Sequence, residues 1–245
     1  METKTYILLA GAWHCAWYWH TVKTALEKKG HRAIAVDLPG HGANKMSLSE
    51  QNLESYARYV SGVLIQEERP VILVGHSMSG GVVCQVAEYC PQNIEKLVIL
   101  SGFLLKDGES INGLQHGIKP TNWQNINEIG IGRLSADRKV TYLDPAFVWE
   151  KCYSDLKDST IKEEVLGHLG GEAIAAQWQA AKLGKNFACV NKVYIKSLQD
   201  EMLPLPLQEK MIQRGVDQVY TINAGHTSFL TAPIQLIDIL LDLAK

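Results

Sequence analysis

A buried strand, a sharp turn with a serine at its apex and a helix follow one another in the first half of the chain. The apolar run 71–74 leads through Gly75 and a histidine to Ser77, and small residues then lead into the helix-compatible stretch 82–87. Larger side chains beside the serine would collide with the neighbouring strand and helix, so small residues suit this turn. The pattern predicts a nucleophile elbow, which holds the Ser77 hydroxyl in an open cleft. Because a helix begins there, the backbone N–H of Met78 points at any anion that forms above the serine oxygen.

The turn departs from the usual Gly-x-Ser-x-Gly pattern at one position. Ser79 stands where the last glycine is usual, and Gly80 and Gly81 follow it. Serine is small, so we expect the turn to survive. The alternative is a plain strand-to-helix turn with an incidental serine, and the complete strand–turn–helix context disfavours it.

A serine hydroxyl needs a base within hydrogen-bond reach and a third group that orients this base. After an elbow of this kind the chain order is serine, then an acid, then histidine. His226 lies in a loop between a short strand and the last expected helix, and it is the candidate base. Asp200 follows the strand 193–197 and can accept a hydrogen bond from imidazole Nδ1. Glu201 competes, but the turn at Pro204 places it nearer the next helix, and either acid has the alternative of solvated loop surface.

The loop after the first buried strand, 6–9, is expected to supply a second donor to the same anion. Gly11 lets the backbone turn, and the N–H of Ala12 is the candidate donor beside that of Met78. His14 in this loop either caps the substrate pocket or braces the loop by hydrogen bonds, and we favour bracing.

Apolar strands alternate with helices along most of the chain. Continuous apolar strands separated by helices predict an α/β fold, with a mostly parallel sheet flanked by helices on both faces. Strands are expected near 5–10, 32–37, 71–76, 96–102, 192–197 and 217–222, and helices over 18–30, 52–68, 79–90, 205–214 and 233–244.

Residues 104–189 break this alternation. They predict a helical cap inserted into a core made of residues 1–103 and 190–245, lying over the serine. The cap's aromatic residues either form its own small core or line the substrate pocket. The candidates for pocket lining are Leu104, Trp123, Phe147 and Trp178, together with His14.

Taken together, these segments resemble the α/β-hydrolase fold. Within it they are similar to the branch that holds plant methylesterases, hydroxynitrile lyases and bacterial esterase and pyrethroid hydrolase relatives. The resemblance spans nearly the whole chain except about 105–190, and its segments are 11–17, 30–42, the Ser77 turn, Leu203-Pro204 with Gln208, and the His226 loop. It implies that the nucleophile is Ser77, the acid Asp200, the base His226, and the oxyanion donors the amides of Ala12 and Met78.

Departures from the branch bear on the reaction. Ala10 and Cys15 stand where a histidine and a glycine are usual. Hydroxynitrile lyases of this branch resemble one another in a lysine directly after the catalytic histidine and a hydroxyl residue in the oxyanion loop. The matching positions here are Thr227 and Gly11, as in esterase members. The resemblance therefore favours ester hydrolysis over cyanohydrin cleavage.

The composition excludes several other functions. A net charge of −2 with dispersed Lys and Arg gives no basic stripe for nucleic acid. The longest apolar runs are strand-sized, well short of a membrane span. The five cysteines show no metal spacing, and residues 1–10 do not read as a signal peptide, so we expect a reduced, cytoplasmic setting.

The predicted function is hydrolysis of a small carboxylic ester, a methyl or aryl ester with an apolar acyl part, through an acyl-enzyme. The expected partner is this small-molecule ester, with no cofactor and no metal, and the sequence leaves a homodimer open. The alternatives are a lyase, cyclase or lactonase of secondary metabolism on the same three residues, or a non-catalytic receptor for a small ligand. A receptor has no need of a complete triad, which disfavours that alternative.

Overall fold

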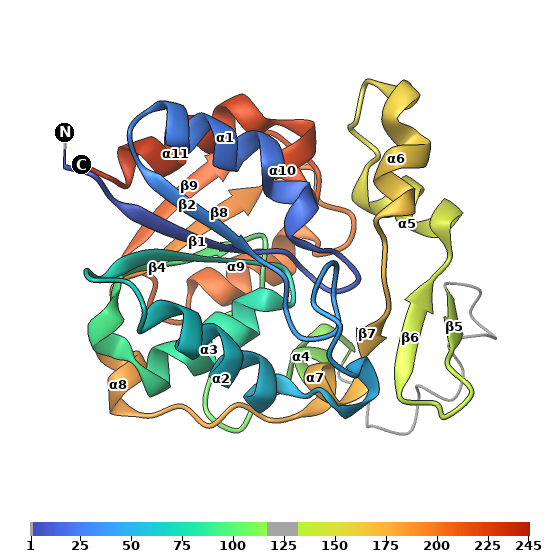
Figure 1. Ribbon diagram of the computed structural model, residues 1–245, viewed down its shortest axis with the longest axis horizontal. Helices are drawn as coiled ribbons and strands as arrows, with labels where there is room; N and C mark the ends of the chain where they lie inside the picture. Colours follow the sequence, from blue (N-terminus) through green and yellow to red (C-terminus); the bar gives the residue numbers. More distant parts are fainter. Residues whose placement is uncertain (1, 117–131) are drawn as a thin grey trace.

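The computed structural model describes residues 2–116 and 132–245. Its main sheet has the strand order β2-β1-β3-β4-β8-β9, and every neighbouring pair in it is parallel (Figure 1). These strands confirm the predicted ones to within two residues: β1 (Thr5–Leu9), β2 (Arg32–Val36), β3 (Val71–His76), β4 (Ile94–Leu100), β8 (Lys192–Ser197) and β9 (Gln218–Ile222).

Helices cover both faces of this sheet (Figure 1). Alternate side chains of β1 point to opposite faces, so Ile7 and Leu9 join one apolar cluster and Tyr6 and Leu8 the other. The first cluster packs under α2 (Leu53–Leu64), α3 (Ser79–Tyr89), α8 (Lys185–Cys189) and α9 (Leu205–Ile212). The second packs under α1 (His20–Lys28), α10 (Ser228–Thr231) and α11 (Pro233–Asp242). Short 3₁₀ turns occupy Ala16–Trp19, Leu48–Glu50, Pro91–Asn93 and Ser159–Ile161.

The order of the strands determines where a binding site is expected. β1 lies between β2 and β3, so the crossover from β1 to β2 runs toward one edge of the sheet, and the crossover from β2 to β3 runs back past β1 toward the other edge. In open parallel sheets, ligands bind outside the carboxyl ends of the strands at such a switch point. The loops that follow β1 and β3 meet there, and they carry Ala12 and Ser77.

The region predicted as a helical cap also contains a second, three-stranded antiparallel sheet, in the order β5-β6-β7. A purely helical cap is therefore wrong. β-branched and aromatic residues such as Val140 and Tyr142 favour a strand here, but the pairing of Thr141 with Glu172 joins residues far apart in the sequence. The elements are α4 (Ile111–His116), β5 (Gly132–Leu134), β6 (Val140–Leu143), α5 (Pro145–Cys152), α6 (Lys162–Gly167), β7 (Glu172–Ala173) and α7 (Ile174–Trp178).

A buried polar cluster joins β7 to the core. The fully buried Glu172 accepts hydrogen bonds from the Tyr56 hydroxyl at 2.9 Å and from His41 Nε2 at 3.1 Å. Burial alone would lower the pKa of His41, but the charge and hydrogen bond of Glu172, with the Pro39 carbonyl and Asp37, raise it above its ordinary value. His41 thus connects the turn after β2 to β7.

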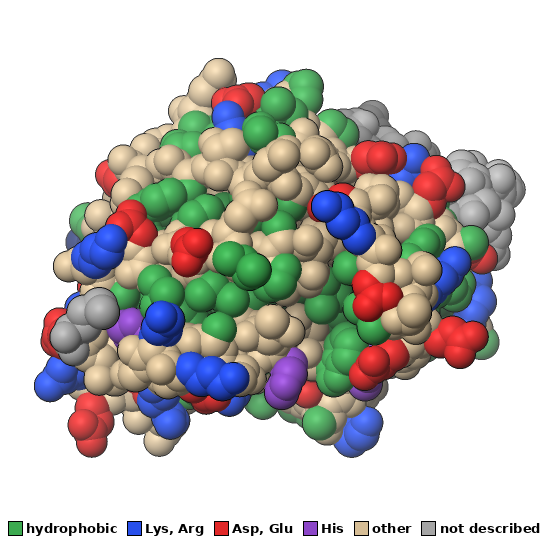
Figure 2. Space-filling view, turned by 90° about the horizontal axis from the view of Figure 1, so that it is seen from above, with side chains coloured by type: hydrophobic (Ala, Val, Ile, Leu, Met, Phe, Trp, Pro, Cys, Tyr) green, Lys and Arg blue, Asp and Glu red, His purple; other side chains and the backbone are tan. Residues whose placement is uncertain are grey.

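The surface carries both signs of charge. Figure 2 shows Lys and Arg interspersed with Asp and Glu on one face, with no region of a single sign. In the described parts of the chain, no helix combines the length and the apolar character needed to cross a membrane.

Candidate active site

Ser77 lies at the apex of the turn between β3 and α3, with a φ of 52°. The left-handed region is unfavourable for serine, and such strain persists only where the surroundings fix the backbone. Three hydrogen bonds do so: the Ser77 N–H donates to the Leu100 carbonyl at 3.1 Å, and its carbonyl accepts from Gly80 at 3.0 Å and Phe103 at 3.1 Å. The predicted elbow is present.

Ser79, the departure from the usual motif, is accommodated. Its hydroxyl donates to the carbonyl of Ala10 at 2.5 Å, so it ties the elbow to the start of the loop after β1. A Cβ at Gly75 would lie 2.4 Å from the Ser79 carbonyl oxygen, so the glycine before the serine is required by close approach.

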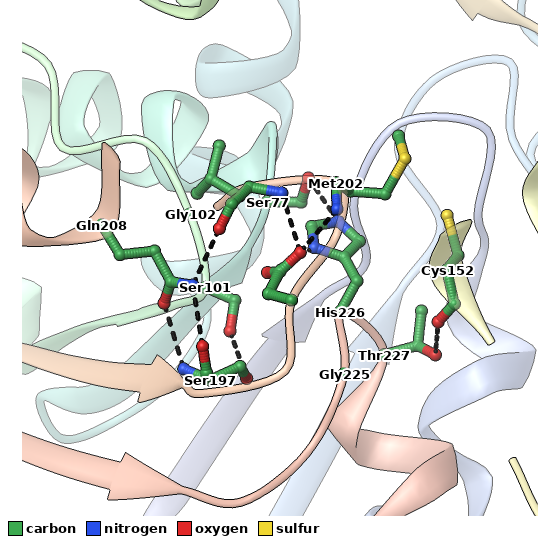
Figure 3. Close-up of polar contacts among 12 residues, drawn as sticks. Ser77, Ser101, Gly102, Cys152, Ser197, Met202, Gln208, Gly225, His226 and Thr227 are labelled. Atoms are coloured by element: carbon green, nitrogen blue, oxygen red, sulfur yellow. Dashed lines mark hydrogen bonds and ion pairs between the residues drawn. The ribbon is translucent and has the colours of Figure 1, made fainter. Parts of the chain in front are cut away.

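The three residues predicted as a triad are in contact. His226 Nε2 lies 3.0 Å from Ser77 Oγ, and His226 Nδ1 lies 2.8 Å from Asp200 Oδ2. Figure 3 shows the Ser77 and His226 side chains pointing toward one another. The other carboxylate oxygen of Asp200 accepts the N–H groups of Met202 at 2.9 Å and Leu203 at 2.7 Å. Because a carboxylate only accepts, Nδ1 donates to it, and Nε2 is left free to take the serine proton.

Glu201, the acid next to Asp200 in the sequence, lies at the surface. Glu201 is exposed and pairs with Lys151 at 3.0 Å, whereas Asp200 is buried. Gln208 holds both ends of the Asp200 loop, since its Nε2 donates to the carbonyls of Ser197 at 2.9 Å and Leu203 at 2.8 Å (Figure 3). The preference for Asp200 over Glu201 agrees with this geometry.

The His226 loop is held on three sides. His76 Nε2 donates to the His226 carbonyl at 2.9 Å, and burial lowers the pKa of His76 well below its ordinary value, so this ring stays neutral. The Gly225 N–H donates to Asp155 Oδ2 at 2.6 Å. The hydroxyl of Thr227 donates to the carbonyl of Cys152 at 2.6 Å (Figure 3).

The loop after β1 forms a tight turn beside Ser77. The His14 N–H donates to the Gly11 carbonyl at 3.2 Å, and Trp13 has a φ of 65°, as the third residue of a type II turn requires. A Cβ at Gly11 would lie 2.8 Å from Ser77 Cβ. Within the described chain, the N–H groups of Ala12 and Met78 donate to no protein acceptor, so both are free for an oxyanion.

His14 has the bracing position rather than a place in the pocket wall. Its Nδ1 lies 2.7 Å from the Ala12 carbonyl and therefore donates, so its Nε2 accepts from the Tyr153 hydroxyl at 2.6 Å. Burial lowers the pKa of His14 to about 4, which keeps the acceptor nitrogen available at neutral pH. Tyr153, which lies in the region predicted as the cap, thus supports the oxyanion loop, a role that the sequence did not signal.

A cavity of about 40 Å³ adjoins the Ser77 hydroxyl. The structure places Leu104 in the buried core and Phe147 and Trp178, both partly buried, outside the lining of this cavity, so these three predictions are corrected; Trp123 lies outside the described residues. How α4 and α7 pack decides the lining, and one sequence does not reveal that packing. The lining residues are Ala12, Trp13, Ser77, Met78, Phe103, Ile111, Gln177, Met202, Leu203 and His226.

Among the described residues, no group of three or more His, Cys, Asp or Glu side chains is placed to hold a metal ion. The cysteines are free, and burial raises the pKa of Cys84 to about 12, so this thiol is not a nucleophile at neutral pH.

Known proteins resemble this chain over its full length. Putative methylesterase 15, chloroplastic, of Arabidopsis thaliana is 28% identical over 260 residues, covering 100% of this chain but 57% of the relative. The chain thus spans little more than half of that protein. Putative methylesterase 19 of the same plant is also 28% identical, with 98% of its length covered. The alpha-hydroxynitrile lyase of Arabidopsis thaliana is 26% identical over 97% of this chain and 96% of its own.

Solved structures share the fold. Polyneuridine aldehyde esterase superposes with a TM-score of 0.86 at 22% identity, covering 100% of both chains. A pyrethroid hydrolase from Sphingobium faniae superposes with a TM-score of 0.84 at 22% identity, covering 99% of this chain and 98% of its own. These findings confirm the resemblance predicted from the sequence motifs. The profile of the alpha/beta hydrolase family matches residues 6–239, and the chain therefore belongs to the alpha/beta hydrolase family.

Proposed function

We propose that this protein hydrolyses a small carboxylic ester through an acyl-enzyme formed on Ser77. The observation that carries the proposal is the continuous hydrogen-bonded chain from Asp200 through His226 to the Ser77 hydroxyl, next to two free backbone N–H groups. Relatives named as methylesterases support the class of substrate. The esters we propose are methyl or aryl esters of small acids.

In this proposal each group of the site has a role. His226 Nε2 takes the proton of Ser77 as the serine oxygen attacks the ester carbonyl, and Asp200 stabilises the imidazolium that results. The N–H groups of Ala12 and Met78 stabilise the oxyanion, and removing one such donor typically costs ~10²–10³ in turnover. His226 then protonates the departing alcohol, and water activated by the same ring releases the acid and restores Ser77.

Residues 104–189 act as a cap in this proposal, and residues 1–103 and 190–245 as the core. Ile111 and Gln177 from the cap line the cavity beside Ser77, which supports its role in substrate choice. A homodimer and a cytoplasmic setting stay predictions.

Cyanohydrin cleavage, the activity named for one relative, is disfavoured by the residues present. Thr227 follows the histidine, and its hydroxyl is engaged with the Cys152 carbonyl, so no lysine ammonium stands directly after His226 to stabilise a cyanide anion. Gly11 brings no hydroxyl into the oxyanion loop, and a Cβ there would lie 2.8 Å from Ser77 Cβ.

The experiment that tests the proposal compares the wild type with Ser77→Ala on p-nitrophenyl acetate and a panel of aryl and alkyl methyl esters. Ser47→Ala, at an exposed serine, is the matched control. We expect turnover in the wild type and in Ser47→Ala and none above background in Ser77→Ala. Full activity in folded Ser77→Ala, or no ester turned over by the wild type, would contradict the proposal.

A further inference from the structure

One polar side chain in the cavity wall has no hydrogen-bond partner among the described residues. Gln177 is 3% exposed, lines the cavity beside Ser77 and His226, and its carboxamide makes no hydrogen bond within the described chain. Other polar wall atoms are engaged: Trp13 Nε1 donates to Thr141 Oγ1 at 3.1 Å, and Ser77 bonds to His226. The remaining side chains that line the cavity are apolar. Among the described lining residues, Gln177 thus has the polar side chain that remains available to bind a ligand.

The other buried glutamines of the described chain behave differently. Gln208 accepts from the Ser197 N–H and donates to two carbonyls. Gln85 bonds the N–H and the carbonyl of Lys182, at 2.8 and 2.9 Å. Gln51 accepts from Ser55 and donates to a carbonyl. Each uses both ends of its carboxamide, as buried amides normally do, so an unbonded one facing a cavity needs an explanation.

The backbone is anchored on both sides of Gln177. It lies on α7, where the Ile174 N–H donates to the Lys139 carbonyl at 2.9 Å. Two residues after Gln177, the side-chain oxygen of Gln179 accepts the Glu54 N–H at 2.9 Å. The helix that carries this carboxamide is thus anchored to the core at one end and to the residue before β6 at the other, so little backbone order is lost when a ligand binds.

We propose that Gln177 determines specificity by hydrogen bonding an oxygen substituent, a hydroxyl or a carbonyl, on the acyl group of the ester bound at Ser77. The inference rests on the proposed ester hydrolysis and narrows it from a plain apolar acyl group to an oxygenated one. A carboxamide can both donate and accept, so it suits either substituent. A plain hydrocarbon acyl group would leave the carboxamide buried and unpaired, and sites of this kind discriminate against such analogues.

The test compares kcat/KM for methyl hexanoate with its hydroxy and oxo derivatives that carry the oxygen at successive carbons. The variants are Gln177→Leu and, as a matched control on the same segment, Gln179→Leu. At one position we expect the wild type to favour the oxygenated ester by about tenfold or more, with no such preference in Gln177→Leu. Gln179→Leu should keep the preference, although it loses a structural hydrogen bond and melts at a lower temperature.

The melting temperature separates an effect on specificity from an effect on the stability of the fold. Because Gln177→Leu removes an unpaired buried amide, its Tm should equal or exceed that of the wild type while its preference disappears. Equal treatment of all esters by an active wild type, or an unchanged preference in Gln177→Leu, would overturn the inference and leave the proposed hydrolysis standing.

Failure of the proposed function itself has a different signature. If the wild type turns over no ester, the same ester pairs are titrated calorimetrically into Ser77→Ala and into the double variant Ser77→Ala, Gln177→Leu. Tighter binding of the oxygenated ester only where Gln177 is present would support its role as a ligand-binding residue. Equal binding in both variants would contradict it.

Discussion

The core and the cap contribute to the candidate site in different ways. Ser77, Asp200 and His226 all follow strands of the main sheet, which end at one edge. The cap segment 152–155 supplies no reacting group, but it touches both loops that carry the chemistry: Tyr153 braces the oxyanion loop through His14, and Cys152 and Asp155 bond to either side of His226. In our proposal the core therefore carries out the reaction, and the cap adjusts the alignment of the reacting groups. Changes in the core should abolish activity, and changes in the cap should tune it.

The largest loss of kcat is expected when Asp200 is replaced, and the adjacent acid Glu201 provides the control. Asp200→Asn presents the wrong tautomer to His226, and we expect kcat for p-nitrophenyl acetate to fall by ~10⁴. Glu201→Gln, at the exposed neighbour that pairs with Lys151, should leave kcat within twofold, which is about 0.4 kcal/mol. Similar losses in both variants would mean that the acid has been assigned wrongly.

A smaller loss of kcat is expected when a single methyl group is added to the oxyanion loop. Gly11→Ala puts a Cβ 2.8 Å from Ser77 Cβ and 3.0 Å from His76 Nδ1, so the loop must shift. Displacing the Ala12 N–H should lower kcat by ~10²–10³ with little change in the far-ultraviolet spectrum. The matched control is Gly62→Ala, at a helical glycine with open space around it, which should leave kcat unchanged and stabilise the fold by about 0.5–1 kcal/mol. Unaltered kcat in Gly11→Ala would exclude this loop from catalysis.

Stability should depend on pH through the brace between the two regions. His14 has a pKa of about 4 in the folded protein and 6.5 as its ordinary value, so the unfolded chain binds the extra proton between these limits. The stabilisation is therefore complete above pH ~6.5 and is lost as pH falls through ~4, by about 3 kcal/mol in the unfolding free energy. His76 adds a loss of the same sign.

Denaturant unfolding from pH 7 to pH 4 measures this dependence. His14→Gln should flatten the decline, and His20→Gln, at an exposed histidine, should leave it as in the wild type. An identical decline in His14→Gln would show that His14 is not buried in its neutral form.

The smallest effect is expected in the cap. Tyr153→Phe leaves His14 Nε2 without its donor and loosens the Ala12 peptide, so kcat should fall about tenfold while KM changes little. The exposed Tyr59 gives the control variant Tyr59→Phe, with no change in either constant. A loss of kcat in Tyr153→Phe as large as that in Asp200→Asn would contradict this division of roles, because the cap would then contribute to the reaction itself.

The sequence predicted which core residues meet at the candidate site, because local patterns determine where these residues lie. A functional residue lies in the loop after the carboxyl end of each of three apolar strands. This pattern located Ser77, Asp200 and His226 without any information about contacts. The same pattern reached Ala12, because Gly11 marks the turn after the first strand.

The cap walls could not be predicted in this way. Leu104 sits in a buried core and not in the cavity lining, and the pairing of β6 with β7 joins segments that the sequence separates. Gln177 lies in a stretch rich in alanine, and the sequence does not show that its side chain lines the cavity, because the packing of α7 decides this. Trp13 had a local signal, because it follows Ala12 in the oxyanion loop, yet its positive φ is visible only in the structure.

The proposed mechanism requires that Ser77 becomes covalently acylated, and rapid-quench mass spectrometry of the wild type with p-nitrophenyl acetate detects this species. We expect an acetyl group to appear on the peptide containing Ser77 during the first turnover and to disappear as acetate is released. Acetylation on another residue, or turnover with no covalent species at any time, would contradict it.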